Sequence, residues 1–379
     1  MPDLTPGHNR EASDTCAAGR LPSASGAPDV SRDRRGGRRT RSGSGHGGEV
    51  RADIVHRRRL AAQLLSGEPA TDPVAVAGRL LAVQAQDLRA ARLAVRARTK
   101  GLTAQDVDRC LTVDRSLVVT WLNRGTLHLV RSEDYAWLHA VTTPQLRTSN
   151  ARRLAQEGVS QQQAERGVKV IQRALADGPL TRASARERLD AAGVPTAGQA
   201  LVHVLMLTCL QGDAVRGPVV GGEQAYVAVP DWLGHQPSVD RDTALAELGR
   251  RYLAGHGPAA DRDLAKWAGV TLGDARRALL SAPQPQTTVV PELPPPRLLG
   301  PWEPLLLGWS SREEVLAGQT GLVTVNGVFK PFALVEGRAV ATWRLTSGRA
   351  MVETFVPLAD KVVAALEEDG EDVVRFLGG

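Results

Sequence analysis

The stretch that decides the fold is Leu117-Val-Val-Thr-Trp-Leu-Asn-Arg-Gly-Thr-Leu-His-Leu-Val130. Its two halves, residues 117–122 and 126–130, are rich in β-branched and large apolar side chains, and Asn123-Arg124-Gly125 separates them. Such side chains favour extended backbone, and a short loop that contains glycine is typical of a hairpin connection. The sequence therefore predicts a β-hairpin here.

Helices are predicted before this hairpin. Leu60, Leu64 and Leu65 have helical spacing, and the segment 66–69 (Ser-Gly-Glu-Pro) ends that helix. Thr71-Asp72-Pro73 combines a capping side chain with proline at the first helical position, which is a start signal for the next helix. Helices followed by a hairpin are the outline of a winged helix.

The same outline recurs along the chain. Helical segments near 168–175, 185–189 and 201–210 precede two strand-like runs, 215–220 and 225–229. A third set of helices spans 244–280, and Gly257-Pro258 occupies the place that Gly178-Pro179 has in the second set. Beyond a proline-rich joint, strands are expected at 322–325, 329–335 and 340–345, with turns at Asn326-Gly327 and Glu336-Gly337 and a final helix at 358–368. This self-similarity indicates repeated units.

The predicted fold class is therefore mainly α with β-hairpin wings (α+β), built as tandem winged-helix repeats with a C-terminal β-rich segment. Four segments are expected: a disordered Arg/Gly/Ser-rich tail at 1–50, and three winged-helix units at 51–155, 156–238 and 239–379, the last with the β-rich segment. The tail almost lacks large apolar side chains, so burial cannot offset its ordering entropy.

Composition narrows the classes of function. Of the 379 residues, 42% are hydrophobic and 23% charged, and the formal net charge of +6 is not confined to the tail, which favours an anionic partner. The sequence contains neither an apolar run of membrane-spanning length nor an apolar signal segment, so we expect a cytoplasmic protein, associated with the nucleoid when bound to DNA. The isolated Cys16, Cys110 and Cys209 predict neither disulfides nor a zinc site. Motifs for nucleotides, metals or a serine nucleophile are also missing, which argues against a small-molecule enzyme.

Four stretches in order resemble one protein family. They are Leu81-Ala-Val-Gln-Ala-Gln-Asp87, Trp121-Leu-Asn-Arg-Gly-Thr-Leu-His-Leu-Val130, Trp302-Glu-Pro-Leu-Leu-Leu-Gly-Trp309 and the run from Asn326 to Arg344. Together they are similar to the winged helix DNA-binding domain-containing family that includes the AlkZ and YcaQ DNA glycosylases, over roughly residues 55–375. The resemblance implies three winged helices around a channel for damaged duplex DNA, and excision of N7-alkylguanines, with unhooking of interstrand crosslinks or protection of antibiotic producers in some members.

The resemblance also implies that Gln84 and Gln86 are the catalytic pair, since Gln84-Ala85-Gln86 has the Gln–apolar–Gln form of the family's catalytic motif. N7-alkylguanine already carries a positive charge and departs readily, so the main task is to place a water against C1′. A glutamine carbonyl can accept a hydrogen bond from that water while its NH2 group donates elsewhere. Side chains two residues apart share a face only in extended backbone, so we expect the motif in a strand or at a helix end. Asp87 beside it is either a base or, as we favour, the cap of the next helix.

Basic residues follow the motif. Arg89, Arg92 and Arg96 have spacing that places them on one helix face, where they either contact DNA phosphates or form a solvated charged face. Arg124 at the hairpin tip is a candidate DNA contact. His128 is either a hydrogen-bonded structural histidine or a contact in the site.

Three tryptophans, Trp302, Trp309 and Trp343, are expected to belong to the core of the β-rich end rather than to wedge into DNA. Glu303 follows Trp302 where relatives often carry Phe-Asp, which leaves the role of that carboxylate open. The favoured hypothesis is a monofunctional DNA glycosylase that acts on double-stranded DNA bearing alkylated guanine, as a monomer, without metal or other cofactor. The competing hypothesis is a non-catalytic winged-helix regulator of transcription. The lesion itself, whether a methyl adduct, a bulky adduct or a crosslink, stays open.

Overall fold

The computed structural model describes residues 45–280, 282, 288–324 and 328–378. Of the predicted tail at 1–50, residues 1–44 lie outside the described residues. Helix α1 (Gly45–Ala62) begins inside the last part of that segment, so helical structure starts before residue 51.

The first unit alternates short helices and strands. It contains α2 (Pro73–Leu80), β1 (Val83–Gln84), α3 (Leu88–Arg96), α4 (Ala104–Thr112), β2 (Leu117–Leu122) and β3 (Thr126–Arg131). Asp72 caps α2 by accepting a hydrogen bond from the backbone N–H of Ala75 at 2.7 Å. Strands β2 and β3 pair antiparallel from Leu117 opposite Arg131 to Leu122 opposite Thr126. The predicted hairpin and the predicted helix start are therefore confirmed.

The first unit ends with a 3-10 turn (Ser132–Asp134), α5 (Tyr135–Thr142) and α6 (Pro144–Gln156). The second unit begins with α7 (Gln161–Leu175), α8 (Arg182–Ala191) and α9 (Ala200–Gln211). Its hairpin is β4 (Ala214–Val220) and β5 (Glu223–Ala228), which turn at Gly221-Gly222, and α10 (Val229–Leu233) follows. Both glycines have positive φ, which residues with a side chain rarely adopt.

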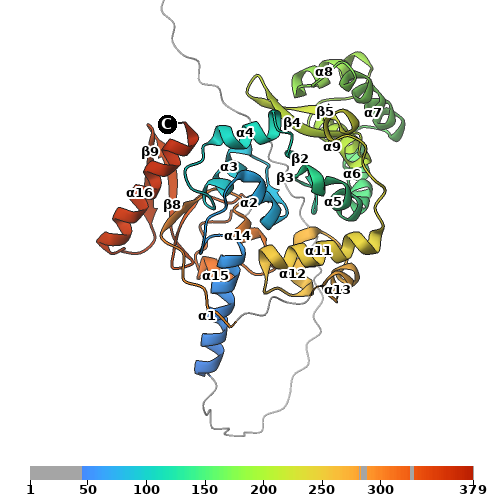
Figure 1. Ribbon diagram of the computed structural model, residues 1–379. Helices are drawn as coiled ribbons and strands as arrows, with labels where there is room; N and C mark the ends of the chain where they lie inside the picture. The colour runs from blue at the N-terminus through green and yellow to red at the C-terminus, as the bar shows by residue number, and fades with distance from the viewer. Residues whose placement is uncertain (1–44, 281, 283–287, 325–327, 379) are drawn as a thin grey trace, which may run out of the picture.

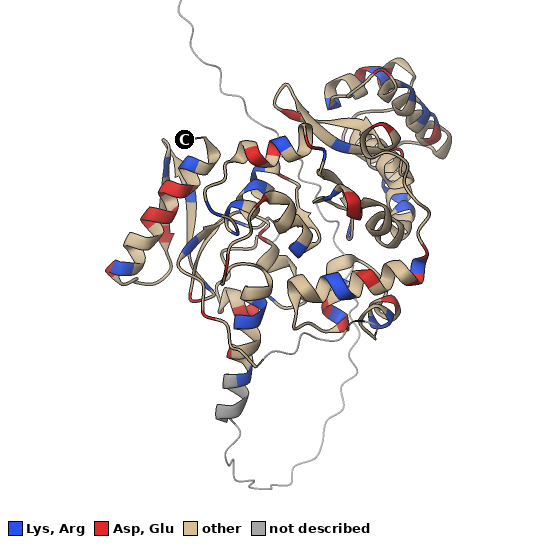
Figure 2. Ribbon diagram, in the orientation of Figure 1, with Lys and Arg blue, Asp and Glu red and all other residues tan. Residues whose placement is uncertain are grey.

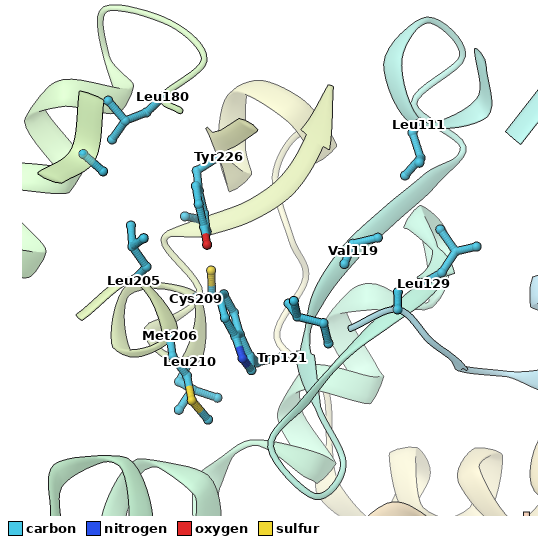
Figure 3. Close-up of a cluster of buried hydrophobic side chains, with 14 of the residues drawn as sticks. Leu111, Val119, Trp121, Leu129, Leu180, Leu205, Met206, Cys209, Leu210 and Tyr226 are labelled. Carbon is cyan, nitrogen blue, oxygen red and sulfur yellow. The ribbon is translucent and has the colours of Figure 1, made fainter. Parts of the chain in front are cut away.

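The hairpins of the first two units form one sheet, a feature the repeat pattern did not indicate. The strand order is β1-β3-β2-β4-β5, and β2 meets β4 antiparallel at Val119 opposite Arg216. The hairpin edge strands β2 and β4 thereby pair part of their backbone N–H and C=O groups with each other. Figure 3 shows the core beneath the junction, where Trp121 of β2 stacks on Tyr226 of β5 with ring centroids 6.3 Å apart and Cys209 of α9 lies beside them. The two units thus share one hydrophobic core.

The third unit begins with α11 (Arg241–His256), α12 (Asp261–Ala268) and α13 (Leu272–Leu280). Its second half holds β6 (Arg297–Leu299), α14 (Pro304–Leu307), α15 (Glu313–Leu316), β7 (Phe332–Val335), β8 (Arg338–Thr346), β9 (Arg349–Thr354) and α16 (Asp360–Leu377). The sheet order is β6-β7-β8-β9. Figure 1 shows α16 along this sheet, on the side away from α7 and α8.

The C-terminal strands agree with the sequence in part. The predicted turn at Glu336-Gly337 joins β7 to β8, with positive φ at both residues. The predicted strand at 322–325 is reduced to a bridge between Val323 and Phe329, and the predicted turn at Asn326-Gly327 lies outside the described residues. Strands β6 and β9 were not predicted, because β6 is very short and β9 is a mostly exposed edge strand without a clear apolar alternation. The whole is a mixed α+β fold, as predicted.

Candidate active site

Gln84 lies in extended backbone between two helices. Helix α2 ends at Leu80, Leu81 takes a positive φ of 67°, and the chain then enters β1. Strand β1 pairs with β3 so that Val83 faces Leu129 and Gln84 faces His128 across the ladder. The expectation of an extended segment at the motif is confirmed, and it follows from the hairpin that offers β1 a free edge.

A polar row crosses the sheet at Gln84. His128 lies between Gln84 of β1 and Thr120 of β2 in register, and neighbouring pairs such as Val83 with Leu129 face the opposite side. The Gln84 residue is 8% exposed, and no hydrogen bond to its side-chain amide occurs within the described part of the chain. The Thr120 hydroxyl is buried and also has no partner among the described residues. Gln84 therefore has a carbonyl and an NH2 group available to a water or a substrate.

Gln86 is held differently from Gln84. Strand β1 leaves β3 at Ala85, whose N–H still donates to the Leu127 carbonyl at 2.7 Å. The Leu127 N–H then donates to Oε1 of Gln86 at 2.9 Å. The Gln86 carbonyl thus completes the ladder in place of a backbone group, and its NH2 group remains available to other partners.

Asp87 caps α3. Its carboxylate accepts a hydrogen bond from the Arg89 N–H at 2.8 Å, and its backbone is extended, as a capping residue requires. The favoured interpretation of Asp87 as a cap is confirmed.

His128 is a neutral histidine with a fixed tautomer. Its Nδ1 lies 2.9 Å from the Thr126 carbonyl, and because a carbonyl only accepts, Nδ1 carries the proton and Nε2 carries the lone pair. The residue is 3% exposed, and burial, followed by the nearby charge of Arg124, lowers the pKa of His128 to about 3. The favoured interpretation of His128 as a hydrogen-bonded structural histidine is confirmed, and the residue lies opposite Gln84 in the sheet.

The three arginines after the motif have three different environments. Arg89 is exposed, whereas the Arg92 guanidinium donates to Asp108 at 2.6 and 2.9 Å. Arg96 is 3% exposed and donates to Asp369 and Asp372 of α16 and to the Leu298 carbonyl.

The prediction that Arg96 contacts a DNA phosphate is corrected by this geometry. Figure 2 shows acidic residues concentrated along α16, and two of them take up the Arg96 charge. Helical spacing correctly placed Arg92 and Arg96 near each other, but α16 covers this end of α3. Arg96 therefore joins α3 to α16 and is withdrawn from the DNA-binding set, while Arg89 stays a candidate.

Arg124 at the hairpin tip reaches the third unit. Its Nη1 donates to the carbonyls of Lys266 and Trp267 at 3.2 and 2.7 Å. Burial, followed by the charge of Arg312, lowers the pKa of Arg124. Lys266 of α12 and Arg312 before α15 thus lie near the hairpin tip, although no signal in the sequence connects residues so far apart in the chain.

The tryptophans and Glu303 have structural partners. Trp309 and Trp343 are buried, and their indole N–H groups donate to the carbonyls of His256 and Leu299 at 3.0 and 2.8 Å. The carboxylate of Glu303 is fully buried against Arg98 at 2.5 Å and caps α14 through the Leu305 N–H. Glu303 therefore balances the buried charge of Arg98, while its Oε2 has no hydrogen-bond partner within the described residues.

The described residues contain no group of three or more His, Cys, Asp or Glu side chains that could hold a metal ion. None of their helices is long and apolar enough to cross a membrane.

Comparisons with known proteins identify relatives of this chain. A curated relative from Streptomyces sahachiroi, described as an interstrand DNA cross-link repair glycosylase, is 28% identical over 359 residues, which is 82% of this chain and 93% of the relative. The solved structure of the Streptomyces sahachiroi DNA glycosylase AlkZ superposes with a TM-score of 0.71 and 23% identity, over 86% of this chain and 96% of that one, which shows a common fold. The model of the AlkZ-like DNA glycosylase family matches residues 77–376. The resemblance, the fold class and the predicted enzyme class, a hydrolase of N-glycosidic bonds in DNA, are confirmed, and the chain belongs to the AlkZ-like DNA glycosylase family.

Proposed function

We propose that this DNA glycosylase excises N7-alkylguanine adducts from double-stranded DNA and unhooks interstrand crosslinks, with Gln84 as the residue that positions the attacking water. The observation that carries the proposal is the Gln84 amide, which is nearly buried and has no hydrogen-bond partner within the described residues. The description of the Streptomyces sahachiroi relative as a cross-link repair glycosylase supports the crosslink as a substrate.

The proposed reaction needs little acid catalysis. Water attacks C1′, the bond from C1′ to N9 breaks with its electrons passing to the base, and the cationic alkylguanine leaves as a neutral base. The proton that the water loses passes to solvent. The transition state resembles an oxocarbenium ion, so the contribution of the protein is to orient the water and to keep extra positive charge away from the sugar.

Gln84 and His128 suit these two tasks. The Gln84 carbonyl accepts from the water while its NH2 group donates to the substrate. His128 stays neutral because burial lowers its pKa to about 3, so the imidazole adds no positive charge beside a cationic lesion. Gln86 supports this arrangement by fixing the strand on which Gln84 lies, through its bond to the Leu127 N–H.

The remaining parts of the proposal concern partners and context. The partner is duplex DNA with an alkylated guanine, which Arg89 and Arg124 contact. The protein acts at the nucleoid as a monomer, without metal or nucleotide cofactor. Self-resistance to a DNA-alkylating natural product fits the crosslink substrate.

The test is base release from a duplex oligonucleotide with one N7-alkylguanine under single-turnover conditions. Wild type is expected to leave an alkali-labile abasic site, and Gln84→Ala is expected to slow release by roughly a hundredfold, the scale of losing one well-placed polar group in an active site. Gln162→Ala, an exposed glutamine on α7, is the matched control and keeps the wild-type rate.

Two results would contradict the proposal. A Gln84→Ala protein with the wild-type rate removes Gln84 from the mechanism. A wild-type protein that binds duplexes but releases nothing from methylated, bulky or crosslinked substrates is a non-catalytic DNA-binding protein.

A further inference from the structure

Three basic side chains from separate segments gather where the hairpin tip of the first unit meets the third unit. They are Arg124 between β2 and β3, Lys266 on α12 and Arg312 just before α15. Arg124 donates to the carbonyls of Lys266 and Trp267, and the Lys266 ammonium donates to the Ser310 carbonyl at 2.8 Å. We call Arg124, Lys266 and Arg312 the basic cluster.

Backbone carbonyls, rather than carboxylates, hold the basic cluster. The Nε of Arg312 donates to the Leu306 carbonyl at 2.8 Å, and its guanidinium lies 5.0 Å from the centre of the Phe329 ring. No ion pair to any of the three cations occurs within the described residues. The interior arginines Arg96 and Arg98 differ, because each is paired with a carboxylate.

Within the described residues no carboxylate is paired directly with the cluster, and Asp263 compensates its charge only in part. Burial, followed by the charges of Arg312 and Arg124, lowers the pKa of Lys266, while the charge of Asp263 raises it. Burial and the charge of Arg312 lower the pKa of Arg124. The carboxylate closest to Lys266 in sequence, Asp263, is engaged by the N–H and hydroxyl of Ser310 at 2.9 and 2.6 Å. Like charges held close together repel one another, so binding of an anion would stabilise the cluster.

The cluster is also rigid and accessible. Gly269, which ends α12, has a φ of 70°, and a Cβ added there would lie 2.5 Å from the Asn123 carbonyl, so the hairpin tip and the helix end are in backbone contact. Surrounding atoms desolvate the Arg124 guanidinium in part, but the Arg124 and Lys266 residues both keep solvent-exposed surface. Asn123 itself is buried, and its amide has no partner among the described residues.

We propose that the basic cluster binds the DNA phosphodiester backbone immediately beside the lesion nucleotide, and so sets the position of the sugar relative to Gln84. Arg124 lies in the turn between β2 and β3, His128 lies on β3, and His128 is the cross-strand neighbour of Gln84, so the cluster and the Gln84 row belong to one neighbourhood. Guanidinium and ammonium groups are the usual phosphate ligands, and a phosphate contact positions DNA without reading its sequence. This inference rests on the proposed function for the choice of ligand.

The first experiment measures duplex binding as a function of salt. The variant Lys266→Gln/Arg312→Gln is compared with Lys169→Gln/Arg173→Gln, which removes the same two charge types from the exposed face of α7. Each lost phosphate contact lowers the slope of log K against log salt by about 0.9. We expect the cluster variant to lose one to two such contacts and at least tenfold in affinity, while the α7 variant keeps the wild-type slope.

The second experiment leaves the protein unchanged, so it does not depend on how well the variant folds. Duplexes with one N7-alkylguanine carry a single neutral methylphosphonate at successive positions around the lesion. We expect wild type to lose affinity when a phosphate next to the lesion is neutralised, and the cluster variant to be insensitive to that position. Equal losses in wild type and variant, or equal salt slopes for the cluster and α7 variants, overturn the cluster site.

Binding and catalysis remain separable in these tests. If wild type releases no base but the coupling between the cluster and the neighbouring phosphate is present, the proposed function fails and the phosphate site stands. If wild type releases base but the coupling is absent, the proposed function stands and the phosphate site fails.

Discussion

At the scale of single residues, the two glutamines of one motif have different hydrogen-bonding environments. Gln84 has an unengaged amide, whereas the carbonyl of Gln86 satisfies the backbone N–H of Leu127 at 2.9 Å. A buried backbone donor without a partner costs about 1–3 kcal/mol. The same substitution is therefore expected to have different consequences at the two positions.

We expect Gln86→Ala to lower the free energy of unfolding by about 1–3 kcal/mol, because the Leu127 N–H loses its acceptor. Gln84→Ala, which breaks no hydrogen bond within the described residues, is expected to stay within about 0.5 kcal/mol of wild type. Urea unfolding of both variants measures the difference. Equal stabilities of the two variants would show that the Gln86 bond contributes nothing to the fold.

The neutral state of His128 predicts an acid-sensitive fold. Burial lowers the pKa of His128 from 6.5 to about 3. Below pH 6.5 the unfolded chain therefore binds a proton that the folded chain does not, and the free energy of unfolding falls by up to about 1.4 kcal/mol per pH unit. This loss ends near pH 3, where both states are protonated.

Between pH 6.5 and 5.0, we expect the free energy of unfolding to fall by about 2 kcal/mol less in His128→Gln than in wild type. The measurement is urea unfolding at several pH values in that window. His235→Gln, which replaces an exposed histidine, is the control and should keep the wild-type pH dependence. Identical slopes for wild type and His128→Gln would mean that His128 is not held neutral in the fold.

At the scale of elements, α3 connects the motif to the C-terminal helix. Arg96 near the end of α3 is buried against Asp369 and Asp372 of α16, while Arg89 near its beginning is exposed. Breaking a buried ion pair by removing one partner costs about 3–5 kcal/mol, since the remaining charges lose their compensation. Asp372 keeps Arg375 as a second partner, so the loss of stability arises mainly because Asp369 is left without a cation.

We expect Arg96→Met to destabilise the protein by about 3 kcal/mol and to speed amide hydrogen exchange in α16. Arg89→Met removes the same charge from the same helix and is expected to change stability by less than about 0.5 kcal/mol. Arg89→Met is expected instead to weaken duplex binding and to lower the slope of log K against log salt. Loss of DNA affinity in Arg96→Met without loss of stability would restore Arg96 to the DNA-binding set.

At the scale of the whole molecule, the three units are not independent. The first unit shares its core with the second, through Trp121 and Tyr226, and its hairpin tip is bonded to α12 of the third. Helix α1 and the residue that follows it are also bonded to the third unit: Arg59 of α1 pairs with Glu314, and Gln63 donates to the Gly255 carbonyl at 2.8 Å. Each unit therefore leaves apolar surface exposed when it stands alone.

We expect the fragment 45–156, which holds α1 to α6, not to fold cooperatively by itself. Its side of the shared core would meet water, and the buried partners from α9 and β5 would be missing. Near-ultraviolet circular dichroism and urea unfolding, with the full chain as control, measure this. A sharp unfolding transition in the fragment would show that the first unit is an autonomous domain.

Local features of this protein were determined by the sequence itself. The cap at Asp72 and the β2–β3 hairpin each depend on residues a few positions apart, so their signals survive in a linear pattern. The cap at Asp87 belongs with them. The two-residue spacing of the glutamines predicted extended backbone at Gln84, although its pairing partner β3 lies further along the chain. Four motifs in order were likewise sufficient to indicate the family.

Only the tertiary structure decided which charges are buried and which are free. Arg89 and Arg96 look alike in the sequence, but Arg96 is bonded to Asp369, which lies 273 residues further along the chain in α16, and Arg89 is exposed. The same holds for Arg124, Lys266 and Arg312, which long-range packing brings together, and for β2 and β4, which join two hairpins into one sheet. An ion pair or an edge pairing depends on where distant elements pack, and hydrophobic periodicity carries information only about the near neighbours of a residue.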